Sequence, residues 1–302
     1  MNIVVVGSIN ADLVINTLRM PKIGETIAGS GFSVNCGGKG VNQAVAAAKL
    51  GGNVRFIGAA GDDENGKVSI ENLEKYGIDT KGVEKIDTNT GVAVITVCNG
   101  DNSIILDSGA NSMVSKEIID KNKDIILGAD AIIMQLEIPV ETVAYAAELA
   151  HTAGVEVVLN PAPVVPMPDK LLENTDTIIL NETEAEHITG LYPDTRENRE
   201  KCINKLKEMG IKNVVLTLGA DGSAYTDGDN IKHQEAFKTN VVDTTAAGDT
   251  FIGAFCMKMK GNIEEAIKYA TAASSITVSR AGASQSIPEN TEVCDLLENM
   301  KV

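Results

Sequence analysis

The stretch AIIMQLEIPVETVAYAAELAHTAGVEVVLNPAP, residues 131–163, predicts a strand, a helix and a second strand in direct succession. Its two ends, 131–137 and 155–163, are short apolar runs rich in β-branched side chains. Between them, residues 140–154 carry apolar side chains at spacings of three and four and end in glycine, as amphipathic helices do. Strands that alternate with helices in this way are typical of a mostly parallel sheet.

The same alternation continues on both sides of this stretch. Further strand-like runs are IVVVG (3–7), VRFIGAAG (54–61), DTIILN (176–181) and NVVLTLG (213–219), and further helix-like segments are 40–51 and 199–210. We therefore expect an α/β fold with a doubly wound, mostly parallel central sheet flanked by helices. Ligands of such sheets bind beyond the carboxyl ends of the strands, so residues that follow the strands are the first candidates for a site.

Two segments, at about 13–35 and 90–108, interrupt this rhythm with short alternating strand patterns. The second contains Asn-Gly-Asp-Asn at 99–102, which predicts a hairpin turn. We expect these strands to form a small β-sheet that acts as a lid over a substrate, with residues 1–302 as one domain. The alternative is that they extend an edge of the main sheet.

Composition limits the function. The chain has 26 basic and 42 acidic residues, a formal charge of −16, which disfavours nucleic acid and anionic membranes as partners. No apolar stretch approaches the roughly 20 residues needed to span a bilayer. The N-terminal residues carry no export signal, and the five scattered cysteines form no Cys-x-x-Cys pair. We therefore expect a cytoplasmic protein in a reducing compartment, without a zinc site.

The segment DTTAAGDTFIGA, residues 243–254, places Asp249 directly after Ala246, Ala247 and Gly248 and before an apolar run that predicts a helix. An acidic residue in the first turn of a helix is ordinary, because free amides and the helix dipole favour negative charge there. The alternative is catalytic. Three small residues would leave backbone amides open to a phosphate, while Asp249 accepts a proton from the attacking group.

Polar side chains follow two of the predicted strands. Asn10 and Asp12 lie in SINAD just past the first strand, and Glu137 ends the run MQLE. Neighbouring hydroxyl groups, as on a sugar, can be bound by a carboxylate that accepts and an amide that both donates and accepts. As a bare pattern, SINAD is equally compatible with an ordinary turn.

The glycine-rich segment NCGGKGVNQAVAAA, residues 35–48, is neither of the common nucleotide loops. Gly40 follows Lys39 where a P-loop needs Ser or Thr, and no G-x-G-x-x-G follows the first strand. The glycines instead allow backbone amides, with Gly38, Lys39 and Asn42, to approach a polyhydroxylated ligand closely.

Two further motifs follow strands. In NETEAE (181–186), Asn181 and Glu184 are suited to orienting magnesium-bound water, or to capping a helix, and the two roles are compatible. In TLGADG (217–222), small and polar residues would leave amides facing nucleotide phosphates, although alone the motif indicates only a turn.

Together, SINAD, GGKGVNQAVAAA, MQLE, LNPAP, NETEAE, TLGADG and DTTAAGDTF occur in the order and approximate spacing of the ribokinase-like carbohydrate kinase family. The resemblance covers nearly the whole chain. The DTxAAGD pattern is specific to the wider family, and SINAD with GGKGxNQA narrows the resemblance to the branch that acts on ribose and its closest relatives.

This resemblance implies transfer of the γ-phosphoryl group of ATP to the 5-hydroxyl of D-ribose, giving ribose 5-phosphate and ADP. It implies Asp249 as the base and Ala246, Ala247 and Gly248 as an anion hole. Alternatives are a kinase for 2-deoxyribose, another pentose or a nucleoside, and a non-catalytic sugar sensor. Ala272, Ala273 and Ser274 stand where the family often has Asn or His near adenine, so the nucleotide preference stays open.

The resemblance also implies the ligand contacts. Sugar binding falls to Asn10, Asp12, Gly38, Lys39, Asn42, Glu137 and Asp249. ATP binding falls to Asn181, Glu184, Thr217, Leu218, Gly219, Ala220, Asp221, Gly222 and Gly248, with Mg²⁺ held through water by Glu184. A monovalent cation, usually K⁺, falls to Asp243, Thr245, Thr277, Arg280, Gly282 and Ser286. The family further implies a homodimer that pairs through the lid.

Overall fold

The computed structural model describes residues 1–98 and 101–299, so Asn99 and Gly100 of the predicted hairpin turn lie outside the described residues. The main sheet has nine strands. Their order across the sheet is β13 (Asn230–Gln234), β12 (Ser223–Asp227), β11 (Asn213–Thr217), β10 (Thr177–Leu180), β9 (Glu156–Leu159), β8 (Ala131–Met134), β1 (Asn2–Val6), β4 (Asn53–Gly61) and β5 (Asp79–Ile86).

The main sheet is doubly wound, as predicted. From β1 the chain proceeds through β4 to β5 on one side, and then returns to place β8 to β11 on the other side. All neighbours from β5 to β11 pair in parallel, and only the hairpin of β12 and β13 adds antiparallel strands. The direction of winding therefore changes between β1 and β8, which is where such sheets bind ligands.

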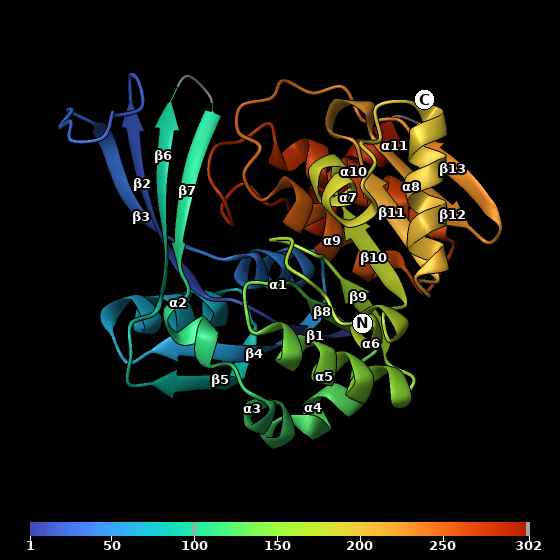
Figure 1. Ribbon diagram of the computed structural model, residues 1–302, viewed down its shortest axis with the longest axis horizontal. Helices are drawn as coiled ribbons and strands as arrows, with labels where there is room; N and C mark the ends of the chain where they lie inside the picture. The colour runs from blue at the N-terminus through green and yellow to red at the C-terminus, as the bar shows by residue number, and fades with distance from the viewer. Residues whose placement is uncertain (99–100, 300–302) are drawn as a thin grey trace.

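Helices cover both faces of the main sheet (Figure 1). One layer contains α1 (Lys39–Lys49), α9 (Ala247–Lys258), α10 (Ile263–Thr277) and α11 (Asn290–Asn299). The opposite layer contains α3 (Lys116–Lys121), α4 (Lys123–Leu127), α5 (Val140–Thr152), α6 (Asp169–Glu173), α7 (Glu182–Thr189) and α8 (Arg196–Glu208). Helix α2 (Glu64–Lys75) lies beside β4 and β5.

The apolar runs fill both layers because successive strand residues point to opposite faces. Ile3 and Val5 of β1 pack into the core beneath α1 and α9, whereas Val4 and Val6 pack into the core beneath α5. A strand buried on both faces needs a continuous apolar run, which is the pattern from which these strands were predicted. No helix in the described ranges is long and apolar enough to cross a membrane.

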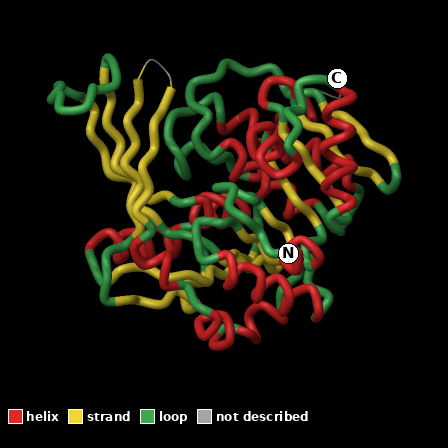
Figure 2. The backbone as a smooth tube through the Cα atoms, in the orientation of Figure 1, coloured by secondary structure: helices red, strands yellow, loops and turns green. Residues whose placement is uncertain are grey.

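The two segments form a separate four-stranded sheet, which confirms the predicted small β-sheet and excludes the edge extension; we call this sheet the lid. Its order is β3 (Ser30–Gly37), β2 (Asn10–Thr17), β6 (Gly91–Cys98) and β7 (Asp101–Asp107). The lid strands project away from the main body, and the loops before α9 and after α10 lie on the side that faces them (Figures 1 and 2). Asn10 and Asp12 do not form a simple turn, because they are the first residues of β2.

The register of the lid separates two faces. Asp12 lies opposite Ala93, and Ala93 lies opposite Leu106, so these three residues share one face. We call this the inner face of the lid, because Asp12 is buried at its base against the main body. Its other face, the outer face, carries a row formed by Leu13, Val34, Val94 and Ile105.

Candidate active site

The carboxyl ends of β1 and β8 bring predicted sugar-binding residues together. Glu137, three residues after β8, accepts hydrogen bonds from the Ser8 hydroxyl (2.5 Å), the Asn10 side-chain amide (3.4 Å) and the Lys39 backbone amide (3.2 Å). One carboxylate thus joins the end of β1, the start of the lid and the start of α1. Ser8 was not predicted, although it stands inside SINAD.

Asn10 is held in one orientation by Asn111, which the sequence did not single out. The side-chain amide of Asn111 donates to Asn10 Oδ1 at 2.7 Å and to the carbonyl of Ile9 at 3.0 Å, and its own oxygen accepts from the Ile9 amide at 2.9 Å. With its oxygen occupied, Asn10 directs its amide donors toward Glu137. The site therefore presents a fixed donor beside a fixed acceptor.

Helix α1 begins where the backbone at Gly38 has φ 94° and ψ 141°, a conformation that favours glycine. This start aims Lys39, Asn42 and Gln43 at the first turn of α9. Burial by itself would lower the pKa of Lys39, but the carboxylates of Asp249, Glu137 and Glu184 raise it above its ordinary value. Lys39 is therefore a retained positive charge among three acids.

Asp12 is a buried carboxyl group at the base of the lid, with 8% of its surface exposed. Burial raises its pKa from 3.8 to about 7, and the negative charges of Glu137 and Asp249 add to this effect. The shift shows that Asp12 is within electrostatic reach of both carboxylates. An uncharged polyhydroxylated ligand can supply the hydrogen-bond donors that this acceptor needs.

The raised pKa of Asp12 predicts a stability difference that depends on pH. Between about 4 and 7 the folded protein binds more protons than the unfolded chain, so this carboxyl group costs stability as the pH rises through that window. Asp12→Asn lacks this loss. In urea unfolding, the variant is expected to gain about 2–3 kcal/mol relative to the parent between pH 5 and pH 8. An equal difference in unfolding free energy at both pH values would contradict the pKa assignment.

The first turn of α9 carries the proposed base. Ala246 precedes it in the left-handed conformation, with φ 59°, and is the one non-glycine residue with positive φ in the described chain. The Ala247 amide donates to the Thr244 carbonyl at 3.2 Å, while Gly248 and Asp249 occupy the turn whose amides have no partner within the helix. The N-terminal end of α9 therefore offers free amides and the positive end of the helix dipole to an anion.

Asp249 points toward α1. Its two carboxylate oxygens accept hydrogen bonds from Gln43 Nε2 at 2.9 Å and from Asn42 Nδ2 at 3.2 Å. The side chain is buried, with 8% of its surface exposed, yet it borders a cavity. These two donors fix the orientation of the carboxylate.

Behind Asp249 lies a buried amide chain that the sequence did not predict. Gln135 Nε2 donates to Gln43 Oε1 at 2.6 Å, and Gln43 Nε2 also approaches Asn160 Oδ1 at 3.4 Å. Gln43 and Gln135 have no exposed surface. The NH₂ group of Gln43 must donate to the carboxylate of Asp249, so the side-chain oxygen of Gln43 must accept from Gln135. The charge on Asp249 therefore sets which group donates at each link of this amide series. Both residues stand in motifs that were singled out in the sequence, Gln43 in NQA and Gln135 in MQLE. They were not predicted as site residues, because neither side chain is exposed.

The cavity in front of Asp249 has a volume of about 200 Å³. Its walls are Lys39, Asn160, Ile179, Leu180, Asn181, Glu184, Thr217, Thr244, Ala246, Ala247, Gly248, Asp249 and Ile252. It therefore collects the ends of β9, β10 and β11, the start of α9 and the lysine of α1. Free amides and one lysine at a small cavity suit a phosphate group.

Gly248 tests whether the cavity is shaped for a ligand. A Cβ atom added there would meet no protein atom within 4 Å, and the residue lacks positive φ, so internal packing does not require glycine. Gly248→Ala is expected to leave stability unchanged or raise it by up to about 1 kcal/mol, because alanine favours helix. Its methyl group would occupy the phosphate approach and lower kcat/KM at least about tenfold. Thermal unfolding and steady-state kinetics measure both; a parallel loss of stability and activity would contradict this account.

Asn181 and Glu184 form the capping box that was one of two predicted roles. Asn181 Oδ1 accepts from the Glu184 amide, and Glu184 Oε2 accepts from the Asn181 amide, both at 2.9 Å. Burial raises the pKa of Glu184, and Asp249 adds to this, while the Asn181 amide and Lys39 oppose it. The capped helix end brings Glu184 to the phosphate cavity, so the capping role leaves the ligand role open.

The 217–222 turn reaches this cavity only through Thr217. Leu218 is buried in the core beneath α8, and Gly219–Asp221 form a single 3-10 turn. Asp221 pairs with Arg199 of α8 at 2.6 Å. Contacts of this segment with a nucleotide would therefore come from its backbone, with the side chain of Leu218 unavailable.

The predicted cation residues lie in two adjoining loops, except Thr277, which is the last residue of α10. Asp243 accepts hydrogen bonds from the Thr245 amide (2.9 Å), the Thr245 hydroxyl (2.7 Å) and the Gly282 amide (3.0 Å). Burial by itself would raise the pKa of Asp243, but these hydrogen bonds hold it below its ordinary value. Thr277 and Ser286 are buried, and Arg280 pairs with Glu292 at 2.5 Å, so its backbone is the part free to face the loops. The two loops meet directly before α9.

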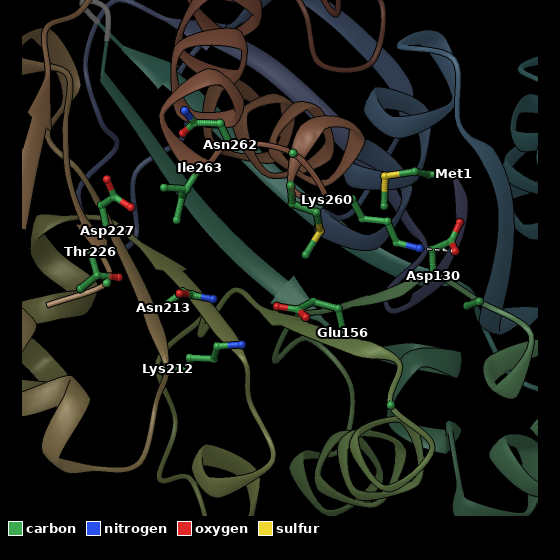
Figure 3. Close-up of a pocket in the computed structure, with 15 residues that line it drawn as sticks. Met1, Asp130, Glu156, Lys212, Asn213, Thr226, Asp227, Lys260, Asn262 and Ile263 are labelled. Atoms are coloured by element: carbon green, nitrogen blue, oxygen red, sulfur yellow. Dashed lines mark hydrogen bonds and ion pairs between the residues drawn. The ribbon is translucent and has the colours of Figure 1, made fainter. Parts of the chain in front are cut away.

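A larger cavity lies elsewhere. It has a volume of about 840 Å³ and is lined by residues such as Glu156, Lys212, Asn213 and Lys260 at the amino ends of the parallel strands (Figure 3). Lys260 pairs with Asp130 at 2.5 Å across it. None of the predicted site residues lines it. Because sheets of this type bind ligands at the opposite edge, the cavity at Asp249 is the candidate active site.

Comparison with known proteins shows similarity to sugar kinases over nearly the whole chain. The model of the pfkB family of carbohydrate kinases matches residues 1–290. A ribokinase from Haemophilus influenzae is 41% identical over 299 residues, which cover 98% of each chain. A deoxyribokinase from Salmonella typhi is 40% identical over 293 residues, covering 95% of this chain and 96% of the other.

Among solved structures, an Arabidopsis thaliana ribokinase complexed with ribose and ATP is similar over 98% of both chains. Its TM-score is 0.91 and its sequence identity is 36%. The similarity includes both the lid and the main sheet, since it extends over nearly the whole length.

Proposed function

Because the chain belongs to the pfkB family of carbohydrate kinases and is therefore an ATP-dependent sugar kinase, we propose that it phosphorylates D-ribose at the 5-hydroxyl, giving ribose 5-phosphate and ADP. One observation carries the proposal. Asp249 borders the 200 Å³ cavity, and its carboxylate also accepts a hydrogen bond from Asn42, one of the predicted sugar-binding residues, at 3.2 Å. A single carboxylate thus adjoins a place for a phosphate and a place for a sugar.

The geometry suits a positioned base. As the 5-hydroxyl oxygen attacks the γ-phosphorus of ATP, its proton passes to Asp249, and the bond from that phosphorus to the bridging oxygen of ADP breaks. The amides at the start of α9 face the charge on the transferring group. Lys39 adds a positive charge at the same cavity. Phosphoryl transfer depends mainly on positioning and charge stabilisation, which these groups supply.

Phosphorylation of 2-deoxyribose is a second candidate function, because a deoxyribokinase is as similar to the chain as the ribokinases are. Asp12 and Asn10 form a buried acceptor and a fixed donor at the sugar site. A sugar that lacks the 2-hydroxyl would leave part of this pair unmatched, which costs binding in a buried site. We therefore place ribose ahead of 2-deoxyribose.

Two ions fit the residues. Mg²⁺ is usually held by substrate phosphates, water and one or two carboxylates, and Glu184 at the cavity is suited to hold such a water. It would neutralise charge on the phosphates. K⁺ binds to backbone carbonyl oxygens, which the joined loops around Asp243 and Gly282 supply beside the start of α9. It would fix the shape of the anion hole.

We also place the protein in the cytoplasm as a homodimer that pairs through the lid. The outer face of the lid exposes Val34 (51%), Val94 (42%) and Ile105 (72%), an apolar row that the lid of a second subunit would bury. All five cysteines are free thiols, as suits a reducing compartment. Sedimentation equilibrium should give the mass of two chains, and a monomer at micromolar concentration would contradict the pairing.

A substrate panel tests the function. At fixed ATP and Mg²⁺, with K⁺ added or withheld, sugar phosphate formation is measured with D-ribose, 2-deoxyribose, other pentoses and a nucleoside. Ribose should have the highest kcat/KM, and K⁺ should raise it. Folded protein that turns over no pentose would remove the proposal, and preference for 2-deoxyribose would favour the second candidate. Ribose binding without sugar phosphate or ATP hydrolysis would indicate a sensor.

A further inference from the structure

Gln43 and Gln135 form a buried amide pair behind Asp249, and the transfer described above gives them no part. Neither side chain has any exposed surface. Among the described residues, Asp249 lines the cavity of about 200 Å³ in front of it, whereas neither glutamine does. The pair can therefore act on a bound ligand only through a neighbouring residue.

The amide of Gln43 is fixed from three sides. Its Nε2 donates to Asp249 Oδ1 at 2.9 Å and to Asn160 Oδ1 at 3.4 Å, while its Oε1 accepts from Gln135 Nε2 at 2.6 Å. Asn160 is fixed in turn, because its Nδ2 donates to the carbonyl of Ile179 at 3.0 Å. A reversed Gln43 amide would place its oxygen against two acceptors. Gln43 thus presents its donor to Asp249 in one direction.

Asn42 is the other donor to Asp249, and its amide is not fixed in this way. It reaches Asp249 Oδ2 at 3.2 Å, but within the described chain its own Oδ1 has no hydrogen-bond partner. The amide of Asn42 is therefore free to turn toward a bound sugar. The direction of the Asp249 carboxylate then depends on Gln43.

The arrangement around Gln135 is costly in stability. Its Oε1 is buried and has no partner within the described chain, and reversing the amide would instead set two oxygens against each other at Gln43. Gln135 also needs Gly7, because a Cβ atom at that position would collide with the Gln135 oxygen. An apolar pair of similar volume would avoid the unpartnered oxygen. Packing alone therefore does not account for two glutamines here.

We infer that Gln135 is a positioning residue for phosphoryl transfer: by holding Gln43, it directs the carboxylate of Asp249 toward the hydroxyl whose proton that carboxylate accepts. The inference rests on the proposed function, in which Asp249 is the base. Each carboxylate oxygen has two lone pairs, and each oxygen of Asp249 uses one of them on α1. The direction of the remaining lone pairs is thus set by α1. Misplacement of a reacting group by about 1 Å can lower a rate about a hundredfold.

Kinetics of Gln135→Met tests this role. The side chain keeps its length but loses the donor to Gln43. We expect kcat about tenfold below that of the parent, with KM for the sugar within about threefold. The melting temperature should stay within a few degrees, because each protein then has one unpartnered oxygen in this pair. Gln234→Met on edge strand β13 is the matched control and should change none of these quantities.

A double-mutant cycle shows whether Gln135 acts through Gln43. Gln43→Met should lower kcat at least as far as Gln135→Met does, and the double variant should match Gln43→Met. Multiplied losses in the double variant would overturn the inference. A raised KM with unchanged kcat in Gln135→Met would also overturn it, because the effect would then lie at Glu137.

Gln135→Glu supplies a readout that a loss of packing would not give. The new buried carboxyl group can donate to Gln43 while it is protonated, but not once it is ionised. Gln43 would then turn its NH₂ group toward the new charge and away from Asp249. The ratio of kcat for the variant to kcat for the parent should fall at least about tenfold between pH 6 and pH 9. The titration of Asp12 is common to both proteins, so a ratio that does not depend on pH would contradict the role.

The outcomes separate this inference from the proposed function. All rates are measured with the sugar that the parent turns over fastest, so the role of Gln135 does not depend on the preference for ribose. A folded parent that transfers phosphate to no sugar would contradict the proposed function itself. An active parent with an equally active Gln135→Met variant would contradict this inference alone.

Discussion

Asp249→Asn is expected to lower kcat at least about a hundredfold while ribose binding is retained, because an amide cannot take the proton of the 5-hydroxyl. The substitution is nearly isosteric. The oxygen of the new amide can still accept from Gln43, and its NH₂ group would face Asn42. Within the described chain Asn42 Oδ1 has no hydrogen-bond partner, so a rotation of the Asn42 amide supplies the missing acceptor. The fold should therefore persist.

Two measurements isolate the chemical step in Asp249→Asn. Single-turnover rates with saturating ribose and ATP report the transfer, and calorimetric titration with ribose reports binding. Thermal unfolding of the variant within a few degrees of the parent shows that the site is intact. Near-normal single-turnover rates would show that another group accepts the proton, and loss of ribose binding would show that Asp249 acts mainly as a sugar ligand.

Gly40→Ala is expected to reduce kcat/KM at least about a hundredfold through geometry alone. A Cβ atom at this position would lie 2.5 Å from the Ser8 nitrogen, 2.7 Å from the Ser8 oxygen and 2.8 Å from the Gly7 carbonyl carbon. These are backbone atoms of the segment after β1, which cannot yield as a flexible side chain can. The start of α1 must therefore move away, and Lys39, Asn42 and Gln43 move with it. Misplacement by about 1 Å is enough for a loss of this size.

The same clash should also lower the unfolding free energy of Gly40→Ala by about 1–3 kcal/mol, as overpacking does. Circular dichroism establishes that the variant is folded before kinetics are measured. The matched control is Gly261→Ala, where the nearest atom to an added Cβ is the Lys258 oxygen at 3.4 Å and φ is not positive. The control should be nearly neutral. Normal kinetics for Gly40→Ala would show that α1 does not depend on this close contact.

The buried strands of the main sheet were predictable because each is apolar over its whole length. β1, β8, β9, β10 and β11 are buried between two helical layers, so the requirement for apolar residues is continuous and visible in the sequence. The strands that sequence reasoning missed are β5 and β13, which lie at the two edges of the sheet, and β12, which lies next to β13. Edge strands are partly exposed and carry polar residues, as in NIKHQ of β13, and this removes the signal.

The site was predictable where it follows strands, and unpredictable where its residues act on one another. The positions of Asp249, Asp12 and Glu137 follow from motifs at the carboxyl edge and at the start of a helix. The contact between Asn10 and Asn111 joins residues separated by 101 positions, and that between Gln43 and Asp249 joins residues separated by 206. No local pattern encodes such pairs, because the partners meet only when the sheet has assembled.

The ³¹P NMR spectrum of the sugar product gives the most direct test of the central claim, that Asp249 serves the 5-hydroxyl of the sugar. D-ribose, ATP, Mg²⁺, K⁺ and the parent protein are incubated, and the proton-coupled signal of the new phosphate ester is recorded. Phosphate on O5 is bonded through a CH₂ group, so the expected signal is a triplet, and it should be absent with Asp249→Asn over the same time. A doublet, which marks a ring carbon with one hydrogen, or release of inorganic phosphate alone, would contradict the account.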